Sequence, residues 1–385
     1  RPVPLAAPGM SLKVFILAGE PSGDKLGGAL MEGFAQLAPG VEYQGIGGPL
    51  MQAQGLSPLF PMEELSVMGI AEVLPKYFHL KRRIRETAEA VLAMQPDVLI
   101  TIDSPDFSLR VAKLVKAASA IRTVHYVAPS VWAWRPKRAQ KMAQSIDHVL
   151  ALLPFEPPYM EAAGMACDFT GHPVVAEPAA TAADIAAMRL GLGLGDGAYM
   201  VALPGSRRSE VSRLAPIFGP DLRIVVPAAG PVAGLVTQET RSWAVDPVIF
   251  DPAGLPPGEA GAVKRALFAG ADLALAASGT VSLELARART PMVVAYSFQW
   301  LTWQIMRRMA LIDTVTLVNL VSETRVVPEC LGPDCTPENI SDALFQVAQE
   351  PGPQDAAMAL TMERLGEGGE APGLRAARAV LDRLG

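Results

Sequence analysis

Short apolar runs recur along the chain, and each stops at a polar or glycine-rich turn. The clearest runs cover residues 13–18, 98–102, 199–203, 271–276 and 291–296. Continuous apolar runs of this length are typical of strands buried on both faces of a parallel sheet. Stretches with apolar residues at helical spacing separate them. The alternation predicts an α/β fold in which helices cover parallel sheets.

The run at 98–102 ends abruptly in Asp103, Ser104 and Pro105. In open α/β sheets the ligand binds beyond the carboxyl ends of the strands, so a carboxylate at this point is placed to meet substrate. The alternative is that Asp103 caps a helix that begins near Phe107. Asp106 is the better candidate for that cap, which leaves Asp103 available as a base.

A glycine-rich stretch at 19–28 joins the first predicted strand to a helix. Such a turn lets backbone amides approach an anion at a helix N-terminus. Ser22, Gly23 and Asp24 lie in this stretch and are candidate binding residues. The alternative is a tight turn that binds nothing.

A loop at 129–138 follows another predicted strand and combines two tryptophans with three cations. Aromatic faces and guanidinium groups together suit a ligand that carries both a sugar and a phosphate. Trp132 and Arg135 are therefore candidate residues for binding such a ligand.

The second half of the chain contains a different anion-binding pattern. A strand, a Pro-Gly turn and paired arginines lead into a predicted helix, and Ser206 and Arg207 lie at its start. A guanidinium at a helix N-terminus binds phosphate oxygens well. The alternative is that Arg207 pairs with Glu210.

A second helix start in this half follows the run at 271–276. Its residues Ser278, Gly279 and Thr280 are small, so their free backbone amides suit a diphosphate. Glu284, one turn further, is placed to accept hydrogen bonds from a ribose diol. The alternative is that it joins the helix surface or forms a capping pair with Thr280.

Two segments combine apolar and basic residues. The segment at 62–85 ends in a cluster of lysine and arginine, and the segment at 298–312 contains two tryptophans and two arginines. Both compositions suit a helix lying on anionic lipid. For the first segment, an ordinary amphipathic helix with a solvated basic face fits at least as well. For the second, packing between domains is the equal alternative. Loops at 318–320 and 327–329 are expected to return to the cleft.

Length and composition set broad limits. The chain has 385 residues, which fits two domains, and a net charge of −6, which argues against nucleic-acid binding. Its three cysteines are widely spaced, which offers neither a disulfide framework nor a metal site. A proline- and alanine-rich linker after His172 predicts domains at 1–172 and 173–350. Residues 351–385 are expected to form a helical segment that packs back on the N-terminal domain.

Many short motifs occur in one order along the chain. They are AGEPSGD, GIGGP, VMGIAEVLP, IDSPDF, HYVAPSVWAWRPKRA, LPFEP, GHP, LPGSRRSEV, ASGTVSLE and VVPE. In this order the chain resembles the lipid-A-disaccharide synthases, from about Leu12 to the C-terminal helix. The resemblance implies a GT-B fold, with two Rossmann-like domains whose parallel sheets face a cleft.

The resemblance also implies a reaction. Enzymes of this family transfer 2,3-diacylglucosamine from UDP-2,3-diacylglucosamine to 2,3-diacylglucosamine 1-phosphate (lipid X). The anomeric carbon inverts, and the products are the β-1,6-linked lipid A disaccharide 1-phosphate and UDP. Asp103 matches the family's proposed base, and Asn319 matches an asparagine near the donor. The resemblance further implies an acceptor side across the cleft, with the candidate residues Ser22, Gly23, Asp24, Trp132 and Arg135. No cofactor is expected, and no Asp-x-Asp pair occurs that would hold a metal on the diphosphate.

The same resemblance places the enzyme in lipopolysaccharide biosynthesis of Gram-negative bacteria. It implies a cytoplasmic protein peripherally associated with the inner membrane, and a possible homodimer. Two other functions fit parts of the sequence. One is another GT-B enzyme that uses UDP-N-acetylglucosamine, such as an epimerase or a polyprenyl-linked transferase. The other is a non-catalytic nucleotide- or lipid-binding protein at the membrane surface.

Overall fold

The structure is a computed structural model that describes residues 11–65, 73–203, 223–228, 233–241, 246–277, 281–298 and 300–384. The chain divides into two compact units. The first comprises residues 1–176 and 368–385, and the second comprises residues 177–367. The segment predicted at 351–385 is therefore shared between the units.

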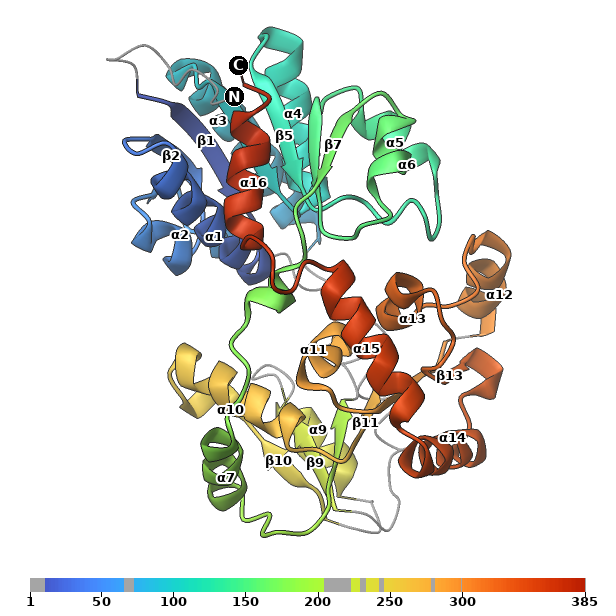
Figure 1. Ribbon diagram of the computed structural model, residues 1–385. Helices are drawn as coiled ribbons and strands as arrows, with labels where there is room; N and C mark the ends of the chain where they lie inside the picture. The colour runs from blue at the N-terminus through green and yellow to red at the C-terminus, as the bar shows by residue number, and fades with distance from the viewer. Residues whose placement is uncertain are drawn as a thin grey trace. The chain divides into compact units, whose positions relative to one another are not determined.

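The first unit contains a seven-stranded parallel sheet in the order β3-β2-β1-β4-β5-β6-β7 (Figure 1). Its strands are β1 (Lys13–Ala18), β2 (Glu42–Ile46), β3 (Ser57–Pro58), β4 (Val98–Ile102), β5 (Arg122–Tyr126), β6 (His148–Ala151) and β7 (Ala166–Phe169). Its helices are α1 (Pro21–Leu37), α2 (Pro49–Ala53), η1 (Met62–Leu65), α3 (Val73–Met94), α4 (Pro105–Ala118), α5 (Lys137–Met142), α6 (Pro157–Glu161), η3 (Pro173–Ala176) and α16 (Pro372–Leu381). Chain order runs outward from β1 on one side and from β4 on the other, as in doubly wound folds.

The second unit contains a six-stranded parallel sheet in the order β10-β9-β8-β11-β12-β13. Its strands are β8 (Met200–Leu203), β9 (Ile224–Pro227), β10 (Val248–Phe250), β11 (Leu273–Ala276), β12 (Met292–Tyr296) and β13 (Glu329–Leu331). Its helices are α7 (Ala182–Gly191), α9 (Ala233–Thr240), η6 (Pro252–Gly254), α10 (Pro257–Ala269), α11 (Val281–Ala288), α12 (Trp300–Met309), α13 (Leu317–Ser322), η7 (Gly332–Asp334), α14 (Pro337–Gln349) and α15 (Gly352–Arg364). The two sheets confirm the predicted α/β class.

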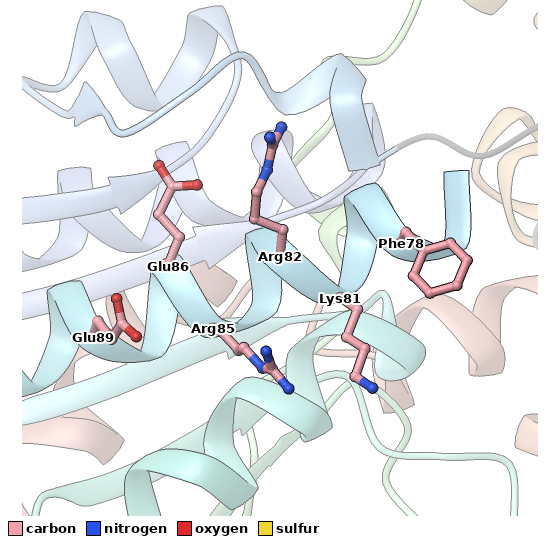
Figure 2. Close-up of a pocket in the computed structure, with 6 residues that line it drawn as sticks. All are labelled: Phe78, Lys81, Arg82, Arg85, Glu86 and Glu89. Atoms are coloured by element: carbon pink, nitrogen blue, oxygen red, sulfur yellow. The ribbon is translucent and has the colours of Figure 1, made fainter. Parts of the chain in front are cut away.

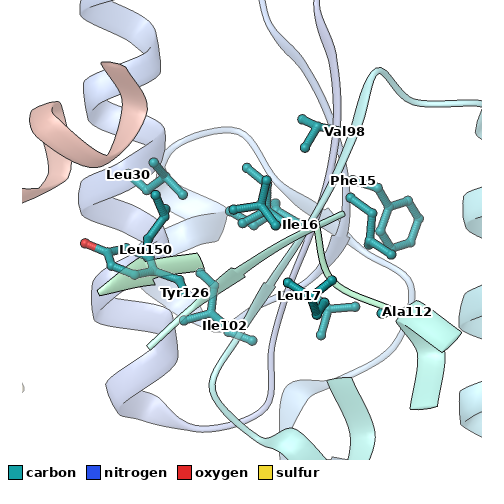
Figure 3. Packing of buried hydrophobic residues seen from close by; sticks show 14 of the residues in the cluster. Phe15, Ile16, Leu17, Leu30, Val98, Ile102, Ala112, Tyr126 and Leu150 are labelled. Atoms are coloured by element: carbon teal, nitrogen blue, oxygen red, sulfur yellow. The ribbon is translucent and has the colours of Figure 1, made fainter. Parts of the chain in front are cut away.

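The core of the first unit lies on both faces of β1 and β4, whose apolar side chains are fully buried. In Figure 3, Ile16 lies toward Leu30 of α1, while Phe15 and Leu17 lie on the side of Ala112 of α4. Successive residues of a strand face opposite sides of the sheet, so a strand covered by helices on both sides must be apolar throughout. This explains why the central strands are the clearest runs in the sequence.

The last helix, α16, packs against α1 in the first unit (Figure 1). It buries Ala376, Ala377 and Val380. In contrast, α15 packs on α11 and α13 in the second unit and buries Met358 and Met362. Each helix buries its apolar side chains in a different unit, so the C-terminal segment divides between the two units.

Candidate functional site

Asp103 lies immediately beyond the carboxyl end of β4. Its backbone N–H donates to the Tyr126 carbonyl at 3.1 Å, which ties this corner to the neighbouring strand β5. No residue in the described part of the chain donates a hydrogen bond or forms an ion pair with its half-buried carboxylate. The acid therefore keeps both oxygens available for a ligand.

The turn after β4 differs from the prediction. Asp103 and Ser104 have φ values of 48° and 45°, so two successive residues adopt the left-handed conformation that non-glycine residues rarely occupy. They turn the chain at once into α4, which begins at Pro105 and not near Phe107. The prediction that Asp106 caps this helix is wrong, because Ser104 occupies the N-cap position and Asp106 lies in the first turn. Strain of this kind is frequent at functional sites.

The glycine-rich turn after β1 touches the same corner. A Cβ atom placed on Gly19 would lie 2.5 Å from the Ser104 Oγ, so the two loops can approach this closely only because residue 19 has no side chain. Leu65, at the end of η1, lies beside the same glycine. Three segments therefore meet next to Asp103.

The glycine-rich turn itself has a structural explanation. Asp24 is only 3% exposed, and its two carboxylate oxygens accept hydrogen bonds from the backbone N–H groups of Leu50 and Met51, both at 3.0 Å. It thus caps α2 and holds it against α1. Gly23 is buried against β1, whereas Ser22 is exposed. Of the three predicted residues, only Ser22 presents its side chain to solvent.

The aromatic and basic loop after β5 separates its two tryptophans. Trp132 is 9% exposed, and its Nε1–H donates to the Glu156 Oε1 at 3.2 Å. Trp134 is only partly buried, and the guanidinium of exposed Arg135 lies 4.2 Å from the centre of its ring. Trp132 therefore anchors the loop from inside. Its ring is too buried to present a face to the sugar that the sequence predicts there. Arg135 remains available to an anion.

Sequence reasoning missed two buried titratable groups beside these loops. Burial raises the pKa of Glu156 to about 7 and lowers the pKa of His125 to about 4. His125 lies in β5, and its Nδ1 is 2.7 Å from the Thr101 Oγ1 of β4. Glu156 belongs to the LPFEP motif, but only the fold reveals that this acid points inward.

A basic surface lies on α3. Lys81, Arg82 and Arg85 border a hollow of about 640 Å³ on the protein surface, together with Phe78, which is 67% exposed. Figure 2 shows Lys81 and Arg85 extending to the same side of the helix. The predicted helix at 62–85 is found as η1 and α3, while residues 66–72, which hold much of its apolar part, lie outside the described residues.

Glu284 and Asn319, which were predicted to bind the UDP-sugar donor, interact with other side chains of the second unit. The Glu284 carboxylate lies 2.5 Å from the Lys264 Nζ, an ion pair that holds α11 against α10. Asn319 is buried; its Nδ2 donates to the Thr314 Oγ1 and the Val327 carbonyl, and its Oδ1 accepts from the Val327 N–H. The predicted loop at 318–320 is wrong, because these residues belong to α13.

The other residues predicted to bind the UDP-sugar donor lie outside the described residues. They are Ser206, Arg207, Ser278, Gly279 and Thr280. Within the described residues, no group of three or more His, Cys, Asp or Glu side chains could hold a metal ion. No helix there is both long enough and apolar enough to cross a membrane.

Comparisons with known proteins agree on one family. The family described as "Lipid-A-disaccharide synthetase" matches residues 14–370. The curated lipid-A-disaccharide synthase of Ruegeria pomeroyi is 69% identical over 394 residues, which covers 100% of this chain and 98% of the relative. The enzyme of the same name from Rhodospirillum centenum is 45% identical, with 96% of this chain and 94% of the relative covered.

Solved structures are similar in fold at much lower identity. The UDP-GlcNAc 2-epimerase from Neisseria meningitidis has a TM-score of 0.58 at 13% identity, with 97% of this chain and 99% of that chain covered. The S. aureus MnaA structure with UDP has a TM-score of 0.60 at 13% identity, with 96% and 95% covered. At this identity the similarity concerns the fold alone.

Proposed function

The chain belongs to the lipid-A-disaccharide synthase family, and from this premise we propose how its residues perform the family's reaction. The protein is a glycosyltransferase that transfers 2,3-diacylglucosamine from UDP-2,3-diacylglucosamine to 2,3-diacylglucosamine 1-phosphate. The new bond joins the acceptor's 6-oxygen to the inverted anomeric carbon, and UDP leaves. The chemistry therefore needs a base for the 6-hydroxyl proton and a site that stabilises the departing diphosphate.

Asp103 is the base. The observation that supports this role is its carboxylate, which has no partner among the described residues although it sits at the carboxyl end of a central strand. As the acceptor oxygen attacks, Asp103 takes its proton, and the electron pair of the broken sugar–phosphate bond leaves with UDP. The left-handed backbone at Asp103 and Ser104, together with the hydrogen bond from the Asp103 N–H to the Tyr126 carbonyl, sets the direction of the acid before substrate binds.

The donor is bound by the second unit. Ser206 and Arg207 bind the diphosphate, and the backbone amides of Ser278, Gly279 and Thr280, which precede α11 in the sequence, add further hydrogen-bond donors. Glu284 lies one turn further and is 32% exposed in its side chain, so it can exchange Lys264 for the ribose hydroxyls. Asn319 contributes indirectly, because its amide bonds hold the 314–316 and 327 segments together.

The acceptor's 1-phosphate is bound by the loop after β5. Arg135 is exposed on this loop, and the loop begins beside Tyr126, whose carbonyl binds the backbone of Asp103. A guanidinium can form two parallel hydrogen bonds to a phosphate. This position gives the acceptor one contact near its anomeric phosphate and one at its 6-hydroxyl.

The test of the base replaces Asp103 with asparagine, which keeps the shape but cannot accept the proton. Asp103→Asn is expected to lower kcat by about 10²- to 10⁴-fold while UDP binding is retained. The matched control is Asp106→Asn, since Asp106 is exposed in the next turn and should tolerate the change. UDP release from the two acylated sugars measures turnover. An Asp103→Asn enzyme that works within a few-fold of the wild type would remove Asp103 from this role.

The acylated substrates reside in a membrane, and we place the protein on the cytoplasmic face of the inner membrane as a peripheral protein. The basic surface on α3 supports this, because three cations beside exposed Phe78 suit anionic lipid. Lys81→Glu with Arg85→Glu is expected to reduce cosedimentation with vesicles that contain phosphatidylglycerol. Lys113→Glu, on the exposed side of α4, is the control. Equal cosedimentation of all three proteins would rule out this surface. A homodimer is also expected, and light scattering at several protein concentrations tests it.

A further inference from the structure

One buried acid of the first unit has no part in the reaction described above. Glu156 is 4% exposed and follows β6 at the carboxyl edge of the sheet. Its Oε1 accepts from the Trp132 Nε1–H at 3.2 Å, and its Oε2 accepts from the Leu153 backbone N–H at 3.0 Å. Both oxygens are therefore used, one within its own loop and one across to the loop after β5.

The packing around this hydrogen bond also favours one orientation of Trp132. The Trp132 ring meets Phe155 edge-on, with ring centres 5.1 Å apart and an interplanar angle of 83°. Phe155 and Glu156 thus hold the same indole from two sides. The buried tryptophan is the described side chain that joins the loop after β5 to the loop after β6.

The loop that Trp132 anchors carries exposed cations. Arg135 lies over the Trp134 ring at 4.2 Å, and Arg138 lies 5.7 Å from the same ring. The loop begins at Val127, which has a φ of 85°, directly after Tyr126. Because the Tyr126 carbonyl accepts from the Asp103 N–H, the anchored loop starts next to the candidate base.

We propose that Glu156 is a positioning residue for the acceptor: by holding Trp132, it fixes the loop whose Arg135 binds the acceptor's 1-phosphate. The inference rests on the proposed function, since it deepens the account of the acceptor site. Glu156 itself touches no substrate. Its removal is expected to weaken acceptor binding and to leave the donor site in the second unit unaffected.

The charge of Glu156 supports the same role. Two N–H groups donate to its carboxylate, so the ionised form makes both bonds, while burial raises its pKa to about 7. Among the described residues, Cys167 of β7 is affected by its charge: burial, and after it the charge of Glu156, raises the pKa of this thiol to about 12, so the thiol stays neutral. Protonation of Glu156 places a hydrogen on an oxygen that must accept one, so the KM for the acceptor should rise as the pH falls below about 7.

The experiment compares Trp132→Phe and Glu156→Gln with the wild type. Trp132→Phe removes the N–H group that hydrogen-bonds to Glu156 but keeps an aromatic ring against Phe155. Glu156→Gln leaves only one oxygen that can accept a hydrogen bond. Loss of one buried hydrogen bond to a charged group predicts a rise of about tenfold in the KM for 2,3-diacylglucosamine 1-phosphate. The KM for UDP-2,3-diacylglucosamine should stay within about twofold, because both substitutions lie in the first unit and the residues proposed to bind the donor belong to the second. Glu161→Gln, on the exposed end of α6, is the matched control and should change neither KM.

A double-mutant cycle separates positioning from general destabilisation. Arg135→Gln should raise the acceptor KM by itself, and adding Trp132→Phe to it should raise the KM little further, because both changes remove the same contact. Independent, multiplying effects would overturn the proposal. So would variants that lose thermal stability but keep the acceptor KM of the wild type. If Glu156→Gln does not fold, Trp132→Phe carries the test. A wild type that releases no UDP from the two sugars refutes the proposed function itself, and with it this inference.

Discussion

The close contact between α1 and α16 involves Gly33 of α1 and Gly373 of α16, and replacing Gly373 tests how the C-terminal segment is held. Gly373 is the second residue of α16 and is buried against α1. A Cβ atom on Gly373 would lie 2.4 Å from the Ala29 carbonyl oxygen and 2.6 Å from its carbonyl carbon. Ordinary contacts of a Cβ atom begin near 3.4 Å. Gly373→Ala must therefore move the two helices apart by about 1 Å, as hard-sphere contacts require.

Two opposing effects decide the sign of this change. Alanine is the better helix former by about 1 kcal/mol in a helix interior, and by less in the first turn. Overpacking costs about 1–3 kcal/mol. The obstructing atoms belong to the backbone of α1, so no rotamer change can relieve the clash. We therefore expect a net loss of about 1–2 kcal/mol in the stability of the docked α16, mainly from overpacking.

The chain offers a matched control. Gly258 is also the second residue of a helix that begins with proline, α10, and a Cβ atom there would meet no atom within 4 Å. Gly258→Ala should thus be neutral or slightly stabilising. Hydrogen exchange of the α16 amides measures the difference directly, because it reports local opening without requiring two-state unfolding. Identical exchange of α16 in both variants would refute the packing argument.

Three further predictions concern buried polar groups. Burial lowers the pKa values of His125 and His148 to about 4, so between pH 4 and 6.5 the unfolded chain binds more protons than the folded chain. The free energy of unfolding should therefore fall on acidification, by about 2 kcal/mol per histidine between pH 6.5 and 5. Urea titrations at several pH values measure this change. Glu156 should have the opposite pH dependence, because burial raises its pKa in the folded protein to about 7. Its contribution to the free energy of unfolding should fall by about 3 kcal/mol as the pH rises from 5 to 8. The Glu156→Gln variant should not show this loss. Gln354 is buried and makes hydrogen bonds to both the N–H and the carbonyl of Met292, so Gln354→Leu should lower the free energy of unfolding by about 2 kcal/mol, measured by urea denaturation.

The central strands were predictable because their sequence is determined by burial on both faces. The predicted strands at 13–18 and 98–102 coincide with β1 and β4. The short strands at the edges of the two sheets could not be predicted in this way. The strand β3 has two residues and β10 has three, which is too short for any period to be recognised. Their place in the sheets is set by pairing with β2 and β9, a contact between distant segments.

The helix α13 shows a second limit. Its residues include Val318, Asn319 and Val321, a mixture that has no clear amphipathic face because all three are buried. What stabilises the segment before it is the Glu329 carboxylate, which accepts from the Thr314 hydroxyl and from the backbone N–H groups of Val315 and Thr316. Because Glu329 is more than ten residues away in sequence from the segment it stabilises, it gives no local signal, and the sequence predicted a loop where the structure has a helix.

Asp24 and Asp103 explain why the site was only partly predictable. Each acid follows a buried strand, and the sequence predicts both near bound substrate, Asp103 as a base and Asp24 in a glycine-rich turn. In the structure, two backbone N–H groups of α2 occupy both oxygens of Asp24, whereas the turn through two left-handed residues leaves Asp103 without a partner among the described residues. Both oxygens of Asp24 are thus engaged in holding α2, so neither is available to accept the proton of a substrate hydroxyl. Candidate acids must therefore be ranked by the partners that the fold leaves them, and by that criterion Asp103 is the stronger candidate.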